Sequence, residues 1–188
     1  MISPAQFERE IELIISNAVR EDVGEGDHSS LACIPGNARG KAKLLVKDSG
    51  IIAGVQFAEK VFKYIDSEMK LEILINDGEE VKKGDIVFFV SGSSQSILKA
   101  ERLVLNGMQR MSAIATKTNE YVQKLKGTQT QILDTRKTAP GLRAECRSGY
   151  RRRDAVLRRR CDALRRRRPR RARGGGRRRA RARSGRTR

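Results

Sequence analysis

Two adjacent cations, Arg136 and Lys137, stand in the polar stretch 134–143, directly after a short apolar run. An arginine offers a planar fork that fits a carboxylate or a phosphate, whereas a lysine offers a point charge suited to phosphate. Neighbouring side chains on an extended segment point in opposite directions, so the two cations can face two different anionic groups. Thr135 adds a hydroxyl beside them. This stretch predicts the binding of an anionic small molecule, and a solvated surface loop is the alternative that the pattern leaves open.

A third cation, Arg102, lies within a run of apolar residues at helical spacing. On the pattern alone it is an ordinary charge on the face of a helix. The single histidine, His28, follows an acidic segment, and we expect it to be structural or solvent-exposed rather than catalytic. The three cysteines match neither a disulfide framework nor a zinc site. The sequence therefore predicts no metal site and assigns no catalytic residue.

Mixed helices and strands must position these side chains. A helix is predicted from Ser3 to about residue 20, where an acidic loop with two glycines begins. Two further helices are predicted over 55–65 and 97–125. Strands are predicted over 40–47, 51–54 and 71–75, around Val81, and over 86–90. A final strand is predicted over 130–133. It would carry the loop 134–143 at its C-terminal end, as in parallel α/β sheets and barrels.

The formal net charge of +19 comes almost entirely from the end of the chain. From residue 144 onward there are 21 Arg, no Lys and three acidic residues, so this quarter carries +18 and the rest +1. We expect 145–188 to be disordered, because this composition buries too little apolar surface. A frameshift or chimeric join, an arm that binds nucleic-acid phosphates, and a targeting segment are its three explanations, in that order of preference. The chain has no apolar run of the length that predicts a membrane span.

Five segments of the first 143 residues form an ordered set of motifs. The most specific is DTRKTAPGLR at 134–143. The others are the acidic glycine loop 21–27 with Ser29 and Ser30, the short pieces 50–54 and 78–85, and the helical stretch 101–116 that contains Arg102. Over about residues 5–143, these motifs closely resemble the quinolinate phosphoribosyltransferases, also called carboxylating nicotinate-nucleotide pyrophosphorylases.

The resemblance implies a type II phosphoribosyltransferase, a homodimer in which an N-terminal α/β sandwich domain precedes an α/β barrel. The implied reaction joins quinolinate to phosphoribosyl pyrophosphate in the presence of Mg²⁺, and gives nicotinate mononucleotide, pyrophosphate and CO₂ for NAD synthesis. By the same resemblance, Arg136 contacts quinolinate, Lys137 contacts the phosphoribosyl side, and Thr135 lines their loop. Arg102 reaches a quinolinate carboxylate in the partner's active site. We expect a cytoplasmic enzyme.

The family pattern ends after Arg143. The segments Gly-Gly-Gly-x-x-His-Arg and Lys-Asp-Asn-His are expected next and are missing. We therefore predict a sandwich domain at 1–112, an incomplete barrel at 113–144 and a tail at 145–188, with little or no activity of the chain as written. The alternatives are a molybdenum-transport-associated paralogue of the same fold, a nucleic-acid-binding protein acting through the tail, and a non-catalytic dimerisation partner.

Overall fold

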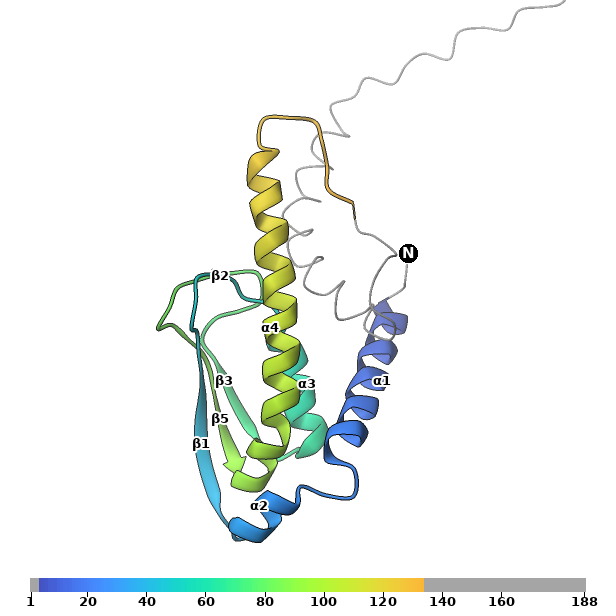
Figure 1. The fold of residues 1–188 in the computed structure, drawn as a ribbon, viewed down its shortest axis with the longest axis vertical. Coiled ribbons are helices and arrows are strands. Elements are labelled where there is room, and N and C mark those ends of the chain that lie inside the picture. Colours follow the sequence, from blue (N-terminus) through green and yellow to red (C-terminus); the bar gives the residue numbers. More distant parts are fainter. Residues whose placement is uncertain (1–3, 134–188) are drawn as a thin grey trace, which may run out of the picture.

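The computed structural model describes residues 4–133, which form a sheet with helices packed against one of its faces (Figure 1). The elements are α1 (Pro4–Val23), α2 (His28–Cys33), β1 (Arg39–Leu45), β2 (Gly50–Ile51), α3 (Val55–Ile65), β3 (Lys70–Ile73), β4 (Glu80–Val81), β5 (Ile86–Ser93) and α4 (Ser94–Lys124). The α/β class predicted from the sequence is confirmed for this part. The tail lies outside the described residues, and the domain boundaries stay predictions.

The main sheet has three antiparallel strands in the order β1-β5-β3, so the last strand of residues 4–133 lies between two earlier ones. Side chains alternate between the two faces of a strand. Along β5, Phe88 and Val90 are buried toward the helices, whereas Phe89 and Ser91 are less buried and lie on the other face. A second, two-stranded sheet pairs β2 with β4.

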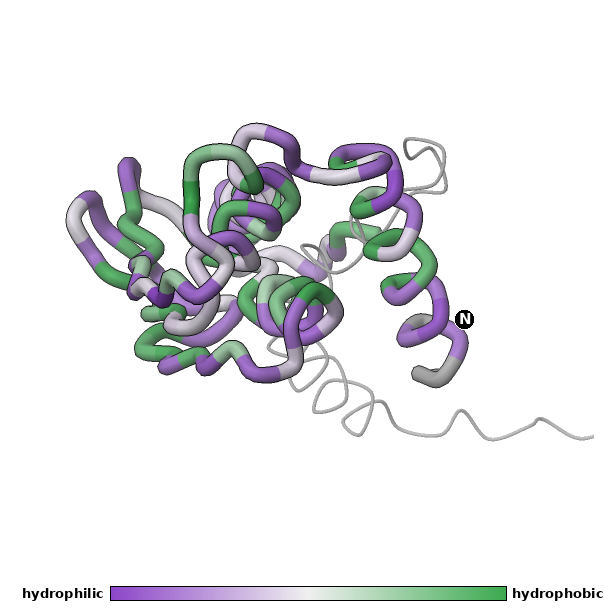
Figure 2. Tube along the Cα trace, turned by 90° about the horizontal axis from the view of Figure 1, so that it is seen from below, coloured by the Kyte–Doolittle hydropathy of each residue, from purple (hydrophilic) through white to green (hydrophobic). Residues whose placement is uncertain are grey.

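The core lies between the main sheet and the two helices α3 and α4. Both helices have apolar residues at helical spacing, and these are buried: Val55, Ala58, Val61 and Phe62 in α3, and Ala100, Val104, Met108, Met111 and Ala115 in α4. Phe62 meets Phe88 of the sheet edge to face, with ring centroids 6.0 Å apart. Figure 2 shows hydrophobic and hydrophilic residues alternating along the helices, as expected of elements with one buried side.

Helix α4 also makes polar contacts with the chain around β2. The backbone N–H of Ile51 donates to Thr116 Oγ1, and that of Ala53 donates to Ser112 Oγ, each over 2.9 Å. The Ser112 hydroxyl in turn donates to the Ala53 carbonyl over 3.1 Å. These bonds satisfy backbone groups that the two-residue strand leaves unpaired, and they fix α4 against β2.

Gly54 lets the chain enter α3 close against α4. Its φ is +100°, and a Cβ at this position would lie 2.5 Å from Met111 Cε and 3.2 Å from Met108 Cα. The Asp77 carboxylate accepts hydrogen bonds from the backbone N–H groups of Gly54, Val55 and Gln56. A residue distant in sequence thus caps the start of α3, where the backbone donors have no partner within the helix.

Two sequence predictions are wrong. Residues 130–133 do not form a strand, and Leu133 is 82% exposed. A strand needs a neighbouring strand to pair with its backbone groups, and this segment belongs to neither of the two sheets of the described residues. The predicted strand over 51–54 is also too long, because β2 ends at Ile51 and the next residues turn into α3.

Candidate functional site

A cleft of about 520 Å³ lies between the first half of α4 and the corner where α1 leads into α2. In Figure 1 this corner lies beside the beginning of α4. The polar residues that line the cleft are Lys99, Glu101, Arg102, Asn106 and Gln109 from α4, and Asp22, Asp27, His28 and Ser29 from the corner. Lys99, Arg102, Asn106 and Gln109 recur at intervals of three and four, so these four share one face of the helix, with Glu101 directly beside Arg102.

Arg102 contacts Asp22 across the cleft, with 2.9 Å between Arg102 Nη1 and Asp22 Oδ1. The arginine side chain is 73% exposed, whereas that of Asp22 is 30% exposed. A guanidinium has five N–H donors, and this contact engages one of its nitrogens. The remaining donors are open to a second anion, such as a carboxylate of a small molecule.

The corner is held in place by a short capped helix. The Asp27 carboxylate accepts from the backbone N–H of Ser30 over 3.2 Å and from its hydroxyl over 2.6 Å. These hydrogen bonds hold the pKa of Asp27 below its ordinary value, and the positive charge of Arg102 contributes to the same shift. Gln95 Nε2 of α4 donates to the Ile34 carbonyl over 2.7 Å, which ties the end of α2 to α4.

The charges that line the cleft do not favour an anion by themselves. Three carboxylates, on Asp22, Asp27 and Glu101, stand against two cations, on Lys99 and Arg102. A dicarboxylate entering this cleft meets one arginine that can bind it and a surrounding potential that opposes it. Tight binding therefore needs further cations from outside the described residues.

The structure brings four of the five sequence motifs into contact. The segments 50–54 and 78–85 pair through β2 and β4, and 50–54 also bonds to α4. The acidic glycine loop and the Arg102 helix form opposite walls of one cleft, although Asp22 and Arg102 are 80 residues apart. His28 is exposed, as predicted, and lies at this cleft. Thr135, Arg136 and Lys137 lie outside the described residues.

Sequence reasoning missed the polar neighbours of Arg102. Lys99, Asn106 and Gln109 line the cleft with it. Their spacing of three, four and three residues around Arg102 was the signal that could have placed them on its face. Asp22 could not be assigned as its partner, because that pairing depends on how α1 and α4 pack.

Within 4–133, no group of three or more His, Cys, Asp or Glu side chains is placed to hold a metal ion. None of the helices in this part is both long enough and apolar enough to cross a membrane.

Two models of one protein family match consecutive parts of the chain. The N-terminal domain model of quinolinate phosphoribosyl transferase matches residues 27–112, and the C-terminal domain model matches residues 114–151. The chain belongs to the quinolinate phosphoribosyltransferase family. The cleft is thus lined mainly by residues of the N-terminal domain of this family, and α4 runs without a break across the point where the two models meet.

Curated relatives and solved structures agree with this assignment. The chain is 42% identical over 141 residues to a chloroplastic carboxylating nicotinate-nucleotide pyrophosphorylase of Oryza sativa subsp. japonica, covering 74% of this chain and 38% of the relative. Quinolinate phosphoribosyltransferase (decarboxylating) 1b of Nicotiana tabacum is 44% identical, with 74% and 40% covered. The crystal structure of NadC from Streptococcus pyogenes superposes with a TM-score of 0.71 at 34% identity, covering 79% of this chain and 53% of that one. The chain therefore spans about two fifths of these curated relatives and half of this solved structure.

Proposed function

We propose that the chain takes part in the transfer of a phosphoribosyl group from phosphoribosyl pyrophosphate to quinolinate. The transfer is accompanied by decarboxylation and yields nicotinate mononucleotide, pyrophosphate and CO₂. Family membership supports the reaction class. The observation that carries the proposal is the exposed Arg102 guanidinium, held by Asp22 at one nitrogen in a cleft formed by two family motifs.

In this proposal Arg102 binds one carboxylate of quinolinate. The net negative lining of the described cleft requires further cations for the second carboxylate and the phosphates. Arg136 is proposed for quinolinate and Lys137 for the phosphoribosyl side, with Thr135 in the same loop. Mg²⁺ is proposed to arrive as the complex of phosphoribosyl pyrophosphate, since the described residues offer no cluster to hold it.

We further propose that two copies of the chain associate, with Arg102 of one copy serving the active site of the other. The exposure of Arg102 supports this, because a side chain that is 73% exposed can be reached by a second copy. Sedimentation at increasing concentration tests the association. A chain that stays monomeric at high micromolar concentration contradicts it.

The binding test compares two arginines of the same helix. Quinolinate, which has two carboxylates, and nicotinate, which has one, are each titrated into the full chain. Backbone amide signals are followed during each titration. We expect quinolinate to bind more tightly and to shift the signals of Asn106 and His28. Arg102→Ala weakens this binding about tenfold, the loss of one charge-assisted contact.

Arg110→Ala is the matched control, because this exposed arginine lies on α4 outside the cleft. It should leave quinolinate binding unchanged. Equal effects of the two substitutions, or equal affinity for nicotinate and quinolinate, contradict the proposal.

Turnover is a separate question from binding. We propose that the chain as written has little or no activity, because the family motifs expected after Arg143 are missing from it. Formation of nicotinate mononucleotide is measured with purified chain, quinolinate, phosphoribosyl pyrophosphate and Mg²⁺. A normal enzymatic rate would overturn this part of the proposal.

A panel of other pyridine and purine acceptors separates quinolinate chemistry from that of the molybdenum-transport-associated paralogue.

The charge of the last 45 residues supports a second candidate function. With +18 from residue 144 onward, this segment can bind nucleic-acid phosphates without sequence preference. Removing residues 145–188 should abolish salt-sensitive retention on RNA and leave quinolinate binding unchanged. Retention that survives the deletion rules out the tail as its cause.

A cytoplasmic location is also proposed, on the absence of a disulfide pattern in the sequence. The names of several relatives include chloroplastic and mitochondrial forms, so the compartment is open to direct test. Fractionation of cells that express the full chain with a C-terminal tag decides it. Recovery in an organelle fraction contradicts the proposal.

A further inference from the structure

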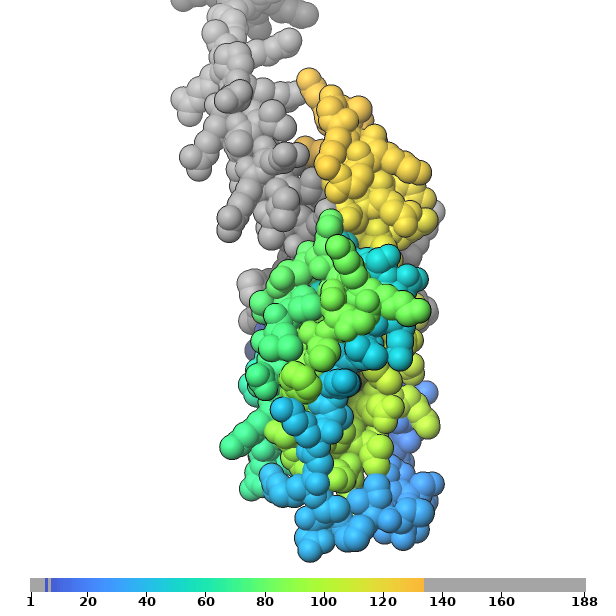
Figure 3. Space-filling model, turned by 90° about the vertical axis from the view of Figure 1, so that its left-hand side faces the viewer, coloured from blue at the N-terminus to red at the C-terminus, as the bar shows by residue number. Residues whose placement is uncertain are grey.

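The face of the main sheet that points away from the helices is basic. Its outward side chains are Arg39, Lys41 and Lys43 from β1, Phe89, Ser91 and Ser93 from β5, and Lys70 and Glu72 from β3. Four cations therefore face one carboxylate, although residues 1–143 together carry only +1. In Figure 3, which views the molecule from this side, no described helix lies in front of the three strands.

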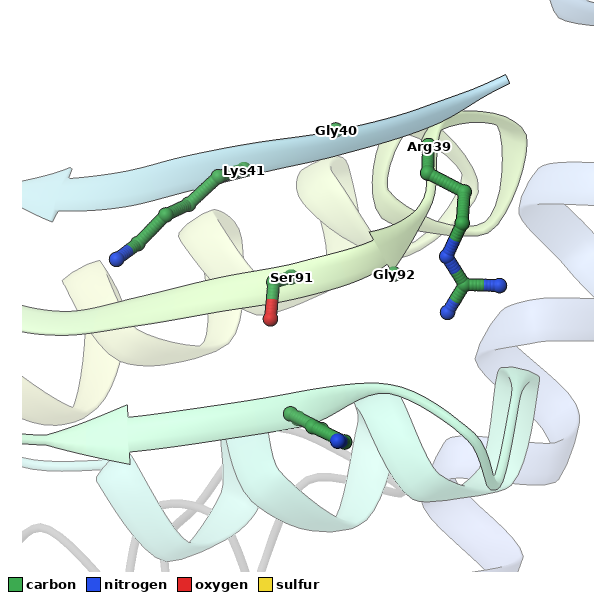
Figure 4. Close-up of a pocket in the computed structure, with 6 residues that line it drawn as sticks. Arg39, Gly40, Lys41, Ser91 and Gly92 are labelled. Carbon is green, nitrogen blue, oxygen red and sulfur yellow. The ribbon is translucent and has the colours of Figure 1, made fainter.

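Strand register concentrates three of these cations at one end of the face. Lys41 and Lys70 are both opposite Ser91 on the central strand, so the two lysines flank its hydroxyl in a single row. Arg39 lies opposite Ser93, one side chain further along the same face. Together with the backbone at Gly40 and Gly92, these residues line a shallow depression of about 440 Å³. Figure 4 shows Arg39 and Lys41 extending from β1 to opposite sides of the Ser91 hydroxyl, which projects from β5.

The cations of this depression are weakly neutralised. Lys41 is 4.0 Å from Glu72, a long contact between two exposed side chains, and its ammonium lies 4.4 Å from the centre of the Phe89 ring. Within the described residues, Arg39 and Lys70 form no ion pair, in contrast to Arg102 with Asp22. Bringing three cations together without matching carboxylates is unfavourable unless an anion joins them.

We propose that this depression binds the diphosphate group of a small molecule. Adjacent strands are about 4.8 Å apart, so Lys41 and Lys70 start roughly 10 Å apart and can each reach one phosphoryl group above Ser91. The Ser91 hydroxyl and the Arg39 fork supply further donors. The basic area is one such group in length, because in the next row Lys43 and Glu72 lie on either side of Phe89 and their charges balance. A small diphosphate fits that length better than a nucleic-acid backbone.

Pyrophosphate is the probe for this site, titrated into the full chain while backbone amide signals are followed. A residue-specific signal is essential, because the arginine-rich tail also attracts phosphates. We expect saturable shifts at Gly40, Ser91 and Gly92 that weaken as salt is added. The double variant Lys41→Gln with Lys70→Gln should weaken this binding about tenfold or more, the loss of two charge-assisted contacts.

The matched control is Lys82→Gln with Lys83→Gln, which removes the same charge from an exposed turn outside the depression. This control should bind pyrophosphate at the three amides as the unchanged chain does. The proposal is overturned if these amides do not shift, or if both double variants weaken binding equally. A single-stranded oligonucleotide that shifts the same amides at lower concentration than pyrophosphate would also overturn it, in favour of nucleic acid.

Discussion

The two flanks of α4 differ in how they are held. On one flank, α3 packs five buried residues into the core, and Ser112 and Thr116 bond to the backbone around β2. On the other flank, Ile11 and Ile15 are the buried residues among the described side chains of α1, and Ser30 is the only buried residue of α2. The cleft with Arg102 lies on this second flank. Stability thus resides mainly in the α3 side, whereas the proposed anion site lies at the more lightly packed corner, as is common for binding loops.

Gly54→Ala should have the largest effect on the free energy of unfolding, because it disrupts the close packing of α3 on α4. The new Cβ meets Met111 and the backbone of Met108, and φ is +100°. We expect a loss of about 3 kcal/mol in the free energy of unfolding, measured by urea denaturation. Gly84→Ala is the control, since Gly84 has the same φ with no atom within 4 Å, and should lose only about 1 kcal/mol. Equal losses would show that contact with α4 is unimportant.

Asp77→Ala should rank second, because it leaves three backbone donors at the start of α3 without their acceptor. We expect the free energy of unfolding to fall by about 2 kcal/mol. Asp77→Asn keeps one acceptor oxygen and should lose about half as much. If both variants unfold like the unchanged chain, the cap contributes nothing.

Ser112→Ala tests the polar link between α4 and the segment after β2. Loss of two hydrogen bonds with Ala53 should lower the free energy of unfolding by about 1 kcal/mol. Thr118→Ala on the same helix serves for comparison, since Thr118 makes no such bond to β2 in the described structure. A larger loss for Thr118→Ala would contradict this assignment.

Asp27→Ala should act locally, on the corner. Amide hydrogen exchange of Ser30 should accelerate, while the free energy of global unfolding changes little. The pKa of Asp27 is lower in the folded chain than in the unfolded one, so its contribution is present at neutral pH. That contribution is lost as the pH falls below about 4, through the lowered folded value. A Ser30 amide signal that does not titrate in this acid range would contradict the hydrogen bond.

Asp22→Asn should have the smallest effect on stability, below about 0.5 kcal/mol, because the pair with Arg102 is exposed. It also removes one of three carboxylates from the cleft. Quinolinate should therefore bind more tightly, as measured by the amide titration above. Weaker binding would instead show that Asp22 is needed to orient Arg102.

The elements with strong periodicity could be predicted from the sequence. The helix predicted over 55–65 matches α3, and the apolar spacing of α4 placed Arg102 on a long helix. Helix α2 was not predicted, since it has six residues and is stabilised by the Asp27 cap and by Gln95 of α4. The segment 130–133 has the composition of a strand, but strand formation depends on a partner that composition does not reveal.

The candidate site was predictable in part. The residue type and family motif identified Arg102, and the acidic loop was recognised separately. Their meeting across 80 residues depends on the packing of α1 and α2 against α4, which no local pattern encodes. The pairing of Lys41 and Lys70 about Ser91 likewise depends on β5 lying between β1 and β3.

The continuity of α4 has a mechanical consequence. The two family models meet between residues 112 and 114, yet Met111 and Ala115 are buried side chains of one uninterrupted helix. Hinges form where a few loop or terminal residues absorb a change of backbone angles, and this junction offers none. The helix is about 45 Å long and moves as one rigid rod, so a displacement of its C-terminal end also displaces its N-terminal part. A displacement of Lys124 is thereby coupled to the orientation of Arg102, which lies in the first third of the same helix.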